Sequence, residues 1–270
     1  MIVVSEAWTM TPAMTDIRDL QLHLDRGRAE SFGSVAAEYD RFRSPFPEPL
    51  IADLAENKPN YALDVASGTG RIPRQLAAHG VRALGVELDA RMAQVARAHG
   101  VEVEVSRFEE WDDRGRTFDL VTVADAWHWI EPKAGIAKIG KVLRPGGTLA
   151  RFFNTHKVPE NLLAGFESIY AKLAPNVMVH GKLPDTIEWK DPLEDSPLFT
   201  HHEKRIYEWE RSFDADSWLG LTRTVSDHQR MDPAEREKLF EMLRGAITFL
   251  GGRFVAKGKT FALFANRSGE

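Results

Sequence analysis

The chain contains no cysteine among its 270 residues. This absence excludes disulfide bridges, cysteine nucleophiles, zinc ribbons and iron–sulfur clusters, because each of them needs a thiol or a thiolate. No stretch approaches the ~18 apolar residues that a membrane-spanning helix needs. The opening residues, MIVVSEAWTM, also lack the basic region and apolar run of a secretory signal. We therefore expect a soluble, cytoplasmic protein without a membrane partner.

Positive charge is not in excess, because 35 Lys and Arg stand against 40 Asp and Glu and the formal net charge is -5. Nucleic-acid binding needs net or clustered positive charge, so we expect no nucleic-acid partner. Aromatic residues are plentiful, with 15 Phe, 7 Trp and 4 Tyr. They provide enough apolar surface to exclude disorder as the main state of the chain.

Strands and helices alternate in the first half of the chain. Apolar runs predict five strands, at residues 61–66, 81–87, 101–105, 118–125 and 148–154. Helical spacing between these runs predicts helices that end near His79, His99 and Leu143, the last of them before the turn RPGG (144–147). This rhythm predicts a parallel, doubly wound α/β sheet of the Rossmann-like type.

The second half departs from this rhythm. Residues 160–173 and 214–225 predict helices, and HEKRIYEWER (202–211) alternates as a strand does. Asp232-Pro-Ala-Glu235 combines an N-cap, a first-turn proline and a first-turn acid, which predicts a helix to about Leu250. Residues 253–265 predict a closing antiparallel strand. The complete prediction is a mostly parallel, seven-stranded sheet with a C-terminal antiparallel hairpin and a lid.

We expect these elements to form one domain with appended segments. Its predicted parts are an N-terminal arm (1–30), a ligand-binding core (31–155), a variable substrate lid (156–200), and C-terminal strands and cap helices (201–270) that complete the core domain.

A glycine-rich turn follows the first predicted strand. In Asp64-Val-Ala-Ser-Gly-Thr-Gly70, the glycines at 68 and 70 let the backbone approach a ligand where a Cβ would clash. Ligands of open parallel sheets bind at the carboxyl ends of the strands, where this turn would lie. Pro73 stands where the dinucleotide fingerprint requires a small residue, and no Gly-Lys-Ser/Thr of a P-loop follows. A pyrophosphate is therefore not the favoured ligand.

Glu87 closes the second strand, nineteen residues after Gly68. A carboxylate at this place can accept two hydrogen bonds from a ribose diol. The glycine turn and the acid together indicate an adenosyl ligand.

These motifs resemble those of the class I S-adenosylmethionine-dependent methyltransferases, and in particular the small-molecule, type 11-like group. The resemblance covers residues 30–155 and, more loosely, the chain to residue 265. It rests on DVASGTGR (64–71), GVELDARM (85–92), FDLVTVADAWHWI (118–130), KVLRPGG (141–147) and TLARFFN (148–154), and YDRFRSPFP (39–47) is similar to the segment that folds over the cofactor. Ser67 departs from the usual Cys or Gly of the family, but it is also small.

The resemblance implies S-adenosylmethionine as the cofactor and methyl transfer to a small-molecule acceptor. The turn after the first strand would line its methionine end, Glu87 would bind its ribose, and Arg43 would pair with its carboxylate. The implied cofactor-binding residues are Tyr39, Arg43, Asp64, Ala66, Ser67, Gly68, Thr69, Gly70, Glu87, Leu88, Met92, Phe108, Glu109, Asp125, Ala126 and Trp127.

Catalysis of methyl transfer needs alignment and exclusion of water more than it needs chemical activation, because the electrophile is already activated. Aromatic faces tolerate a sulfonium cation, and Tyr39, Trp127 and Trp129 are the candidates, with core packing as the alternative for Trp129. An acceptor with an acidic proton needs a base, for which His128 and His156 are candidates; His128 also suits an orienting role. No carboxylate triad suggests a metal, so we expect none.

Five residues are candidates for the acceptor pocket: Trp129, Asn154, Trp218, Thr222 and Ser226. The last three are four residues apart and share a helical face as far as that helix runs. Core packing suits Trp218 equally well.

Two other functions use the same cofactor site. One is a non-methylating reaction of the same fold, such as a cyclisation, and the other is a non-catalytic binder. The intact Asp64–Gly70 turn, Glu87 and the Asp125–Trp129 segment favour an active methyltransferase. The acceptor molecule, its O, N, C or S atom and the oligomeric state stay open.

Overall fold

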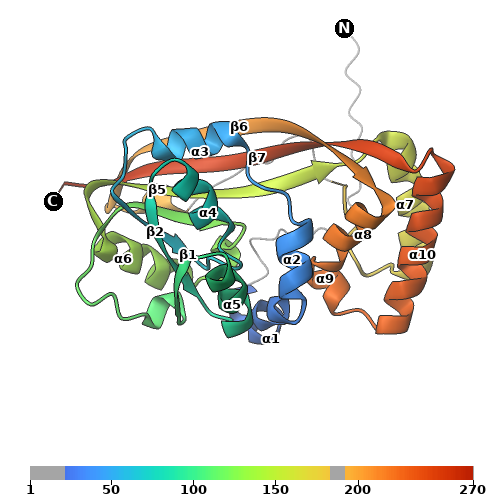
Figure 1. Cartoon of the computed structure of the whole chain (residues 1–270), viewed down its shortest axis with the longest axis horizontal. Coiled ribbons are helices and arrows are strands. Elements are labelled where there is room, and N and C mark those ends of the chain that lie inside the picture. Colours follow the sequence, from blue (N-terminus) through green and yellow to red (C-terminus); the bar gives the residue numbers. More distant parts are fainter. Residues whose placement is uncertain (1–21, 183–191, 270) are drawn as a thin grey trace, which may run out of the picture.

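The computed structural model describes residues 22–182 and 192–269. Residues 1–21 of the predicted N-terminal arm, residues 183–191 of the predicted lid and residue 270 lie outside the described residues. Its strands are β1 (Tyr61–Val65), β2 (Arg82–Glu87), β3 (Glu102–Val105), β4 (Phe118–Ala124), β5 (Leu143–Lys157), β6 (Phe199–Asp214) and β7 (Arg253–Arg267). They form one sheet in the order β3-β2-β1-β4-β5-β7-β6 (Figure 1). The strands β1 to β5 pair in parallel, and β7 is antiparallel to both β5 and β6. The predicted Rossmann-like sheet is confirmed.

The helices fall into three groups. Before β1 lie α1 (Arg26–Ala29), α2 (Ala36–Phe42) and α3 (Glu48–Ala55), and the parallel strands are joined through α4 (Arg71–Ala78), α5 (Ala90–Ala98) and α6 (Pro132–Val142). The cap half contains α7 (Glu160–Leu173), α8 (Ala215–Arg223), α9 (Ser226–Gln229) and α10 (Pro233–Phe249). Short 3₁₀ turns are η1 (Leu22–Leu24), η2 (Glu30–Val35), η3 (Phe108–Glu110), η4 (Trp127–Trp129) and η5 (Pro192–Asp195).

Two cap-half helices, α8 and α10, begin at aspartates whose side chains accept from the first backbone N–H groups. Asp214 Oδ1 accepts a hydrogen bond from Ser217 N, and Ser217 Oγ accepts one from Asp214 N, which completes a capping box. Asp232 accepts from the N–H groups of Ala234 and Glu235. These local signals explain why α10 begins where the sequence predicts it.

Three predicted elements differ in extent. The strand predicted at 148–154 begins at Leu143, because Leu143 already pairs with Phe118 and the RPGG segment is accommodated by a register shift. The helix predicted at 214–225 ends at Arg223, where the Thr224 hydroxyl donates to Leu221 O. The strand predicted at 202–211 extends from Phe199 to Asp214 as β6. It pairs with β7 as predicted, and the two predicted helices, α8 and α10, connect the strands together with the short α9. The helix α3 was not predicted.

The central parallel strands β1 and β4 are buried on both faces, as their apolar runs require, whereas the edge strand β3 is partly exposed. One core cluster, which includes Leu63, Val121 and Ile139, packs the sheet against α6, and another, with Leu50, Ile72 and Phe152, packs it against α3 and α4. A separate cluster around Trp218, Phe166 and Leu243 joins α7, α8 and α10. No helix in the described part of the chain is long and apolar enough to cross a membrane.

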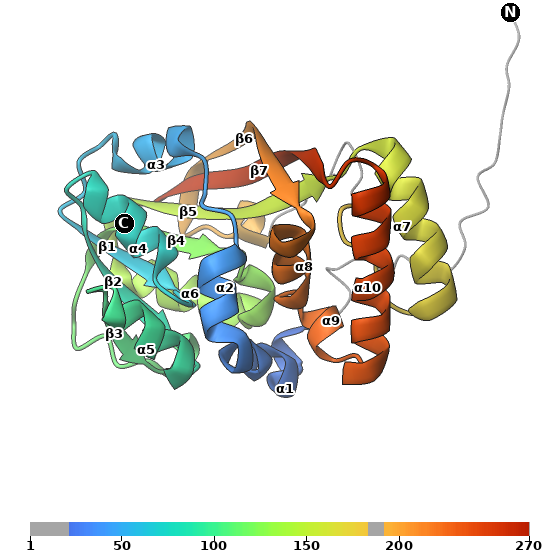
Figure 2. The same cartoon turned by 45° about the vertical axis from the view of Figure 1, so that its right-hand side comes forward.

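The helix α2 lies between the strand–helix core and the cap half in both views (Figures 1 and 2). On the core side, Asp40 accepts a hydrogen bond from Arg74 of α4 and contacts His99 after α5. On the cap side, a Cβ at Gly220 of α8 would lie 2.6 Å from the ring of Phe42, so only glycine permits this approach. β5, β6 and β7 continue past the core and carry the cap half, so both halves share one sheet.

Candidate functional site

The turn after β1 lies at the centre of the sheet, where the strand order reverses between β1 and β4. Open α/β sheets bind ligands at this point. Ala66, Gly68 and Gly70 all adopt left-handed backbone angles (φ 54°, 56° and 76°), and Asp125, which follows β4, does the same (φ 53°). A left-handed alanine or aspartate costs about 1–3 kcal/mol, and such strain is concentrated at ligand sites.

Glu87 holds this turn in place. Its Oε2 accepts a hydrogen bond from Gly68 N at 2.7 Å, and its Oε1 accepts one from Asp89 N at 2.9 Å. Burial raises the pKa of Glu87, and the backbone hydrogen bonds from Asp89 and Gly68 act in the opposite direction. The Leu88 backbone gives Glu87 a third hydrogen bond, so one of the about four lone-pair sites of the carboxylate is left for a ligand hydroxyl.

A pocket opens beside the turn. Its lining is Tyr39, Phe46, Asp64, Ala66, Ser67, Gly68, Thr69, Arg71, Ile72, Ala124 and Asp125. Most of these residues were predicted to bind the cofactor, but Arg71 was not. Ser67 Oγ and Arg71 Nη2 are buried without a hydrogen-bond partner in the described structure. Buried polar atoms are nearly always satisfied in proteins, so these two point to a polar ligand.

Arg71 lines this pocket but was not among the predicted site residues. It opens α4 directly after Gly70, and its guanidinium lies 5.5 Å from the ring of Phe46. Burial lowers the pKa of Arg71, and the nearby charge of Asp125 acts in the opposite direction. The one signal in the sequence was its position next to the glycine turn.

Two buried carboxyl groups flank the pocket. Burial raises the pKa of Asp64 to about 7, although the Thr122 hydroxyl donates to it at 2.6 Å. Burial also raises the pKa of Asp125, against the nearby charges of Arg43 and Arg71 and a 2.9 Å hydrogen bond from Asn154 N. The protonation of both carboxyl groups therefore depends on the charge of any ligand bound between them.

The segment before α2 covers the Glu87 side of the site. A Cβ at Gly33 would lie 2.0 Å from Asp89 Oδ2, so η2 sits directly on this loop. Phe32 makes edge contacts with Tyr39 (ring centroids 5.9 Å apart) and Trp129 (5.7 Å). The predicted covering role of the N-terminal segment thus has a structural counterpart in η2 and α2.

Arg43 reaches from α2 to the cap half. Its Nε donates to Thr224 Oγ1 at 2.9 Å and its Nη2 to Thr224 O at 3.0 Å, while the guanidinium lies 4.9 Å from the Tyr39 ring. His128 is exposed, yet burial of its ring by surrounding protein, together with Arg28 and Arg43, lowers its pKa to about 4. The pocket beside the glycine turn, together with the covering η2 and α2, forms the candidate cleft of this site.

His156 lies in an aromatic enclosure at the end of β5. Its ring centroid is 5.0 Å from that of Trp209 and 6.2 Å from those of Phe213 and Trp218. Burial, with the charges of Arg43, Arg211 and Arg71, lowers its pKa to about 3, and its buried Nε2 has no hydrogen-bond partner in the described structure. The structure therefore holds His156 neutral, which makes it a weak base.

The three predicted pocket residues of the cap half have different positions. Trp218 is fully buried and stacks on His180 with ring centroids 4.5 Å apart, so it does not line an open pocket. Thr222, on the same face of α8, contacts His180 Nδ1 at 2.8 Å. Ser226 belongs to α9 and accepts a hydrogen bond from Arg28. His180 was not predicted, because it lies in an irregular segment without a motif.

Trp127 differs from its prediction as a cation-facing side chain. Its ring lies 4.0 Å from the guanidinium of Arg151 and packs near Gly135 of α6, so it does not line the pocket beside the glycine turn. Trp129 is the tryptophan beside the cleft, 4.7 Å from His128.

The remaining predicted cofactor residues surround the Glu87 side. Met92 is buried and its methyl group would lie 3.5 Å from a Cβ at Gly68. Phe108 and Ala126 are buried, Glu109 accepts a hydrogen bond from Glu131 N, and the Leu88 backbone contributes a hydrogen bond to Glu87.

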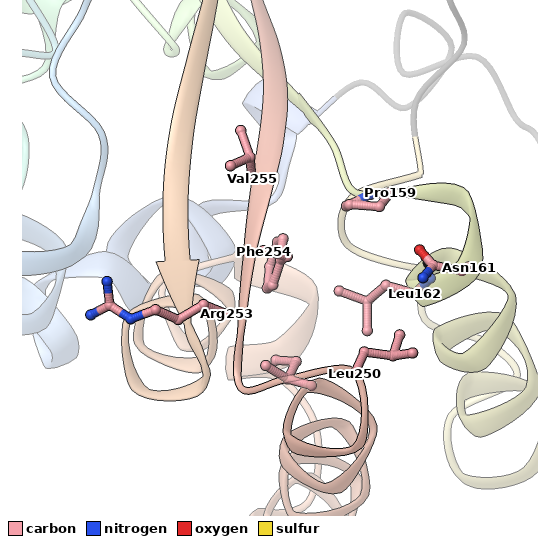
Figure 3. Close-up of a pocket in the computed structure, with 8 residues that line it drawn as sticks. Pro159, Asn161, Leu162, Leu250, Arg253, Phe254 and Val255 are labelled. Carbon is pink, nitrogen blue, oxygen red and sulfur yellow. Dashed lines mark hydrogen bonds between the residues drawn. The ribbon is translucent and has the colours of Figure 1, made fainter.

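A second cavity, of about 280 Å³, lies between α7, α10 and the start of β7 (Figure 3). Its lining is mostly apolar, with Leu162, Ile247 and Phe254, and Arg253 is its only charged residue among those described. It contains none of the predicted site residues. No cluster of His, Asp and Glu in residues 22–182 and 192–269 has the arrangement of a metal site.

Comparisons with known proteins agree with this geometry. Residues 62–147 match a family model described as a methyltransferase domain. An uncharacterised methyltransferase of Mycobacterium tuberculosis is 33% identical over 132 residues, or 48% of this chain and 54% of that relative, so the chain spans about half the length of the first curated relatives it matches. A ubiquinone biosynthesis O-methyltransferase of Hahella chejuensis is 30% identical over 212 residues, which cover 72% of this chain and 82% of the relative.

The chain belongs to the class I methyltransferase family. A proposed type II methyltransferase from Anaeromyxobacter dehalogenans has the same fold, with a TM-score of 0.61 at 22% identity over 84% of this chain and 98% of the other. Membership of this family confirms the resemblance that the motifs predict.

Proposed function

We propose that this methyltransferase binds S-adenosylmethionine beside the Ala66–Gly70 turn and transfers its methyl group to a small-molecule acceptor. The observation that carries the proposal is the pairing of Glu87 with the Gly68 N–H, next to a pocket in which Arg71 Nη2 has no protein partner. Three relatives are named as O-methyltransferases, which supports oxygen as the accepting atom.

The residues present fit an amino-acid nucleoside. Glu87 would bind the ribose hydroxyls, with Met92 and Phe108 near the adenine. Arg71 suits the carboxylate of the methionine part better than Arg43, because both Nε and Nη2 of Arg43 already donate to Thr224. Ser67 Oγ, buried without a partner, adds a second polar contact on the same side.

The cofactor supplies an activated methyl group, so this chain mainly has to hold, align and dehydrate the reactants. Tyr39 and Trp129 present aromatic faces to the cleft, and η2 and α2 cover it. Burial favours the neutral forms of Asp64 and Asp125, and a cation bound near them would favour their ionised forms, which would compensate its charge. His128 and His156 stay proposals as proton acceptors, but their lowered pKa values argue for a modest role.

A transfer assay separates methylation from the alternatives. The protein is incubated with methyl-labelled S-adenosylmethionine and a deproteinised small-molecule extract of cells that express the gene. We expect labelled small-molecule product and an equal amount of S-adenosylhomocysteine. Turnover of an acceptor with intact cofactor would establish a non-methylating reaction. Binding of the cofactor without any turnover would establish a binder, and absence of binding would refute the proposal.

A further inference from the structure

Asn154 of β5 joins a chain of partly buried hydrogen bonds. Trp209 Nε1–H donates to Thr260 Oγ1 at 3.0 Å, and the Thr260 hydroxyl donates to Asn154 Oδ1. In this arrangement Asn154 Oδ1 is occupied, and the Nδ2 group, with its two hydrogens, is the end left for a ligand.

Asn154 adjoins the proposed methyl-donor site. Its backbone N–H donates to Asp125 Oδ1 at 2.9 Å, and Asp125 lines the pocket beside the glycine turn. His156 lies two residues further along β5, and alternate residues of a strand share a face. His156 is only 8% exposed, and its Nε2 lacks a partner in the described structure. Two polar groups on one face of β5, one of them buried, are therefore available to a polar ligand.

The surroundings of this face are cationic. Arg43 donates to the hydroxyl and carbonyl of Thr224, and Arg211 donates to Ser44 Oγ at 2.7 Å. No ion pair joins either arginine to a carboxylate in the described ranges. The charges of both act on His156, and that of Arg43 also acts on His128, His180 and Asp125. The positive charge of Arg43 thus reaches groups on β5, after β4 and in the cap half.

We propose that the acceptor is a carboxylate, bound by Asn154 Nδ2 on the His156 face of β5, attracted there by the positive charge of Arg43, and methylated on oxygen to a methyl ester. This inference rests on the proposed function. The Asn154 Nδ2 group supplies N–H donors, and hydrogen bonds from such donors to a carboxylate are stronger than bonds to a neutral group. The Trp209 ring, whose centroid lies 5.0 Å from that of His156, offers an apolar surface to the rest of the acceptor.

The chemistry balances without a base. A carboxylate oxygen forms a bond to the methyl carbon while the bond from that carbon to sulfur breaks, and the electron pair of the broken bond stays on sulfur. The negative charge of the carboxylate and the positive charge of the sulfonium cancel, and no proton has to leave. This agrees with a site whose histidines are too weakly basic to deprotonate an alcohol.

The product of the labelled extract assay tests the inference apart from the proposed function. A methyl ester releases volatile labelled methanol in alkali, whereas ethers, methylamines and C-methyl products keep the label. We expect most of the transferred label to be released as methanol. Label that stays in the product would overturn the carboxylate acceptor and leave the methyltransferase function standing. No transfer at all would overturn both.

A matched pair of variants tests the binding group. Asn154→Asp keeps the oxygen that accepts from Thr260 but replaces the donor with a second, repelling oxygen. We expect it to lower kcat/KM for the extract acceptor at least about tenfold. Asn266→Asp, at the opposite end of the β5–β7 ladder where Nδ2 contacts Thr148, is the control and should retain activity.

Calorimetry with S-adenosylhomocysteine should give the same affinity for both aspartate variants, which shows that the cofactor site is intact. Asn154→Ser, which removes the donor without adding charge, covers the case in which Asn154→Asp does not fold. Equal kcat/KM in the Asn154 and Asn266 variants would overturn the assignment.

Discussion

The carboxylate of Glu87 accepts a hydrogen bond from the backbone N–H of Gly68 at 2.7 Å, and this bond joins the end of β2 to the turn after β1. One side chain thus has two tasks in the proposed site. It keeps the glycine turn in its left-handed conformation, and it presents its remaining lone-pair site to a ribose. Most of the predictions below depend on separating such structural tasks from ligand binding.

Glu87→Gln should weaken S-adenosylhomocysteine binding by about 1.5–3 kcal/mol, because the amide cannot accept charge-assisted bonds at both positions. Isothermal calorimetry measures this change. Glu102→Gln is the control, since Glu102 lies at the start of neighbouring β3 and pairs with Arg82 at the surface. Equal affinity of the two variants would remove Glu87 from the ligand site.

Arg71→Met should reduce affinity for S-adenosylhomocysteine by about tenfold or more, because a charge-assisted bond is lost. It should leave the affinity for 5′-methylthioadenosine unchanged, because that ligand lacks the amino-acid carboxylate. Arg82→Met, at the exposed start of β2, controls for loss of charge. A matching loss for both ligands would show that Arg71 supports the turn and does not bind the carboxylate.

Asp64→Asn should stabilise the protein more at about pH 8 than at about pH 5. Burial raises the pKa of Asp64 to about 7 in the folded state, above its unfolded value of about 4. Ionisation of Asp64 therefore costs stability as the pH rises through this window, and asparagine avoids the cost while its oxygen still accepts from Thr122. The gain above pH 7 is at most about 4 kcal/mol.

Urea unfolding at the two pH values measures this effect. Asp113→Asn is the control of opposite sign, because hydrogen bonds from Lys138 and Lys141 lower the pKa of Asp113 and stabilise its charged form. A stability gain for Asp64→Asn that does not change with pH would contradict the assignment of a raised pKa.

Gly220→Ala should destabilise the protein by about 1–3 kcal/mol, because the new methyl group overlaps the Phe42 ring and displaces α2. Because α2 carries Tyr39 and Arg43 lies at its end, cofactor affinity should also fall. Gly245→Ala on the exposed side of α10 meets no atom within 4 Å and should gain up to about 1 kcal/mol. Thermal unfolding of both variants, with and without S-adenosylhomocysteine, tests this contrast. If the ligand stabilised both variants equally against thermal unfolding, the packing of α2 on α8 would have no effect on cofactor binding.

The strands and the glycine turn were predictable because their signals are local. An apolar run such as FDLVTVAD and the paired glycines at 68 and 70 depend on the backbone and on near neighbours, and the structure has β4 and the left-handed turn at these places. The extension of β5 to Lys157 was not predictable in this way. It depends on pairing with β7, whose partner residues are about a hundred positions away.

The sequence by itself determined the order of strands and helices, the family and the turn that faces the proposed cofactor, because period, capping residues and motif spacing are written in consecutive residues. Only the tertiary structure decided which side chains share the cleft. Arg71 Nη2 is buried without a protein partner, and the Trp127 ring lies against the guanidinium of Arg151. Asn154 Oδ1 accepts a hydrogen bond from Thr260, which in turn accepts one from Trp209. Burial, partnership and orientation are properties of groups brought together from distant parts of the chain, and no local pattern encodes them.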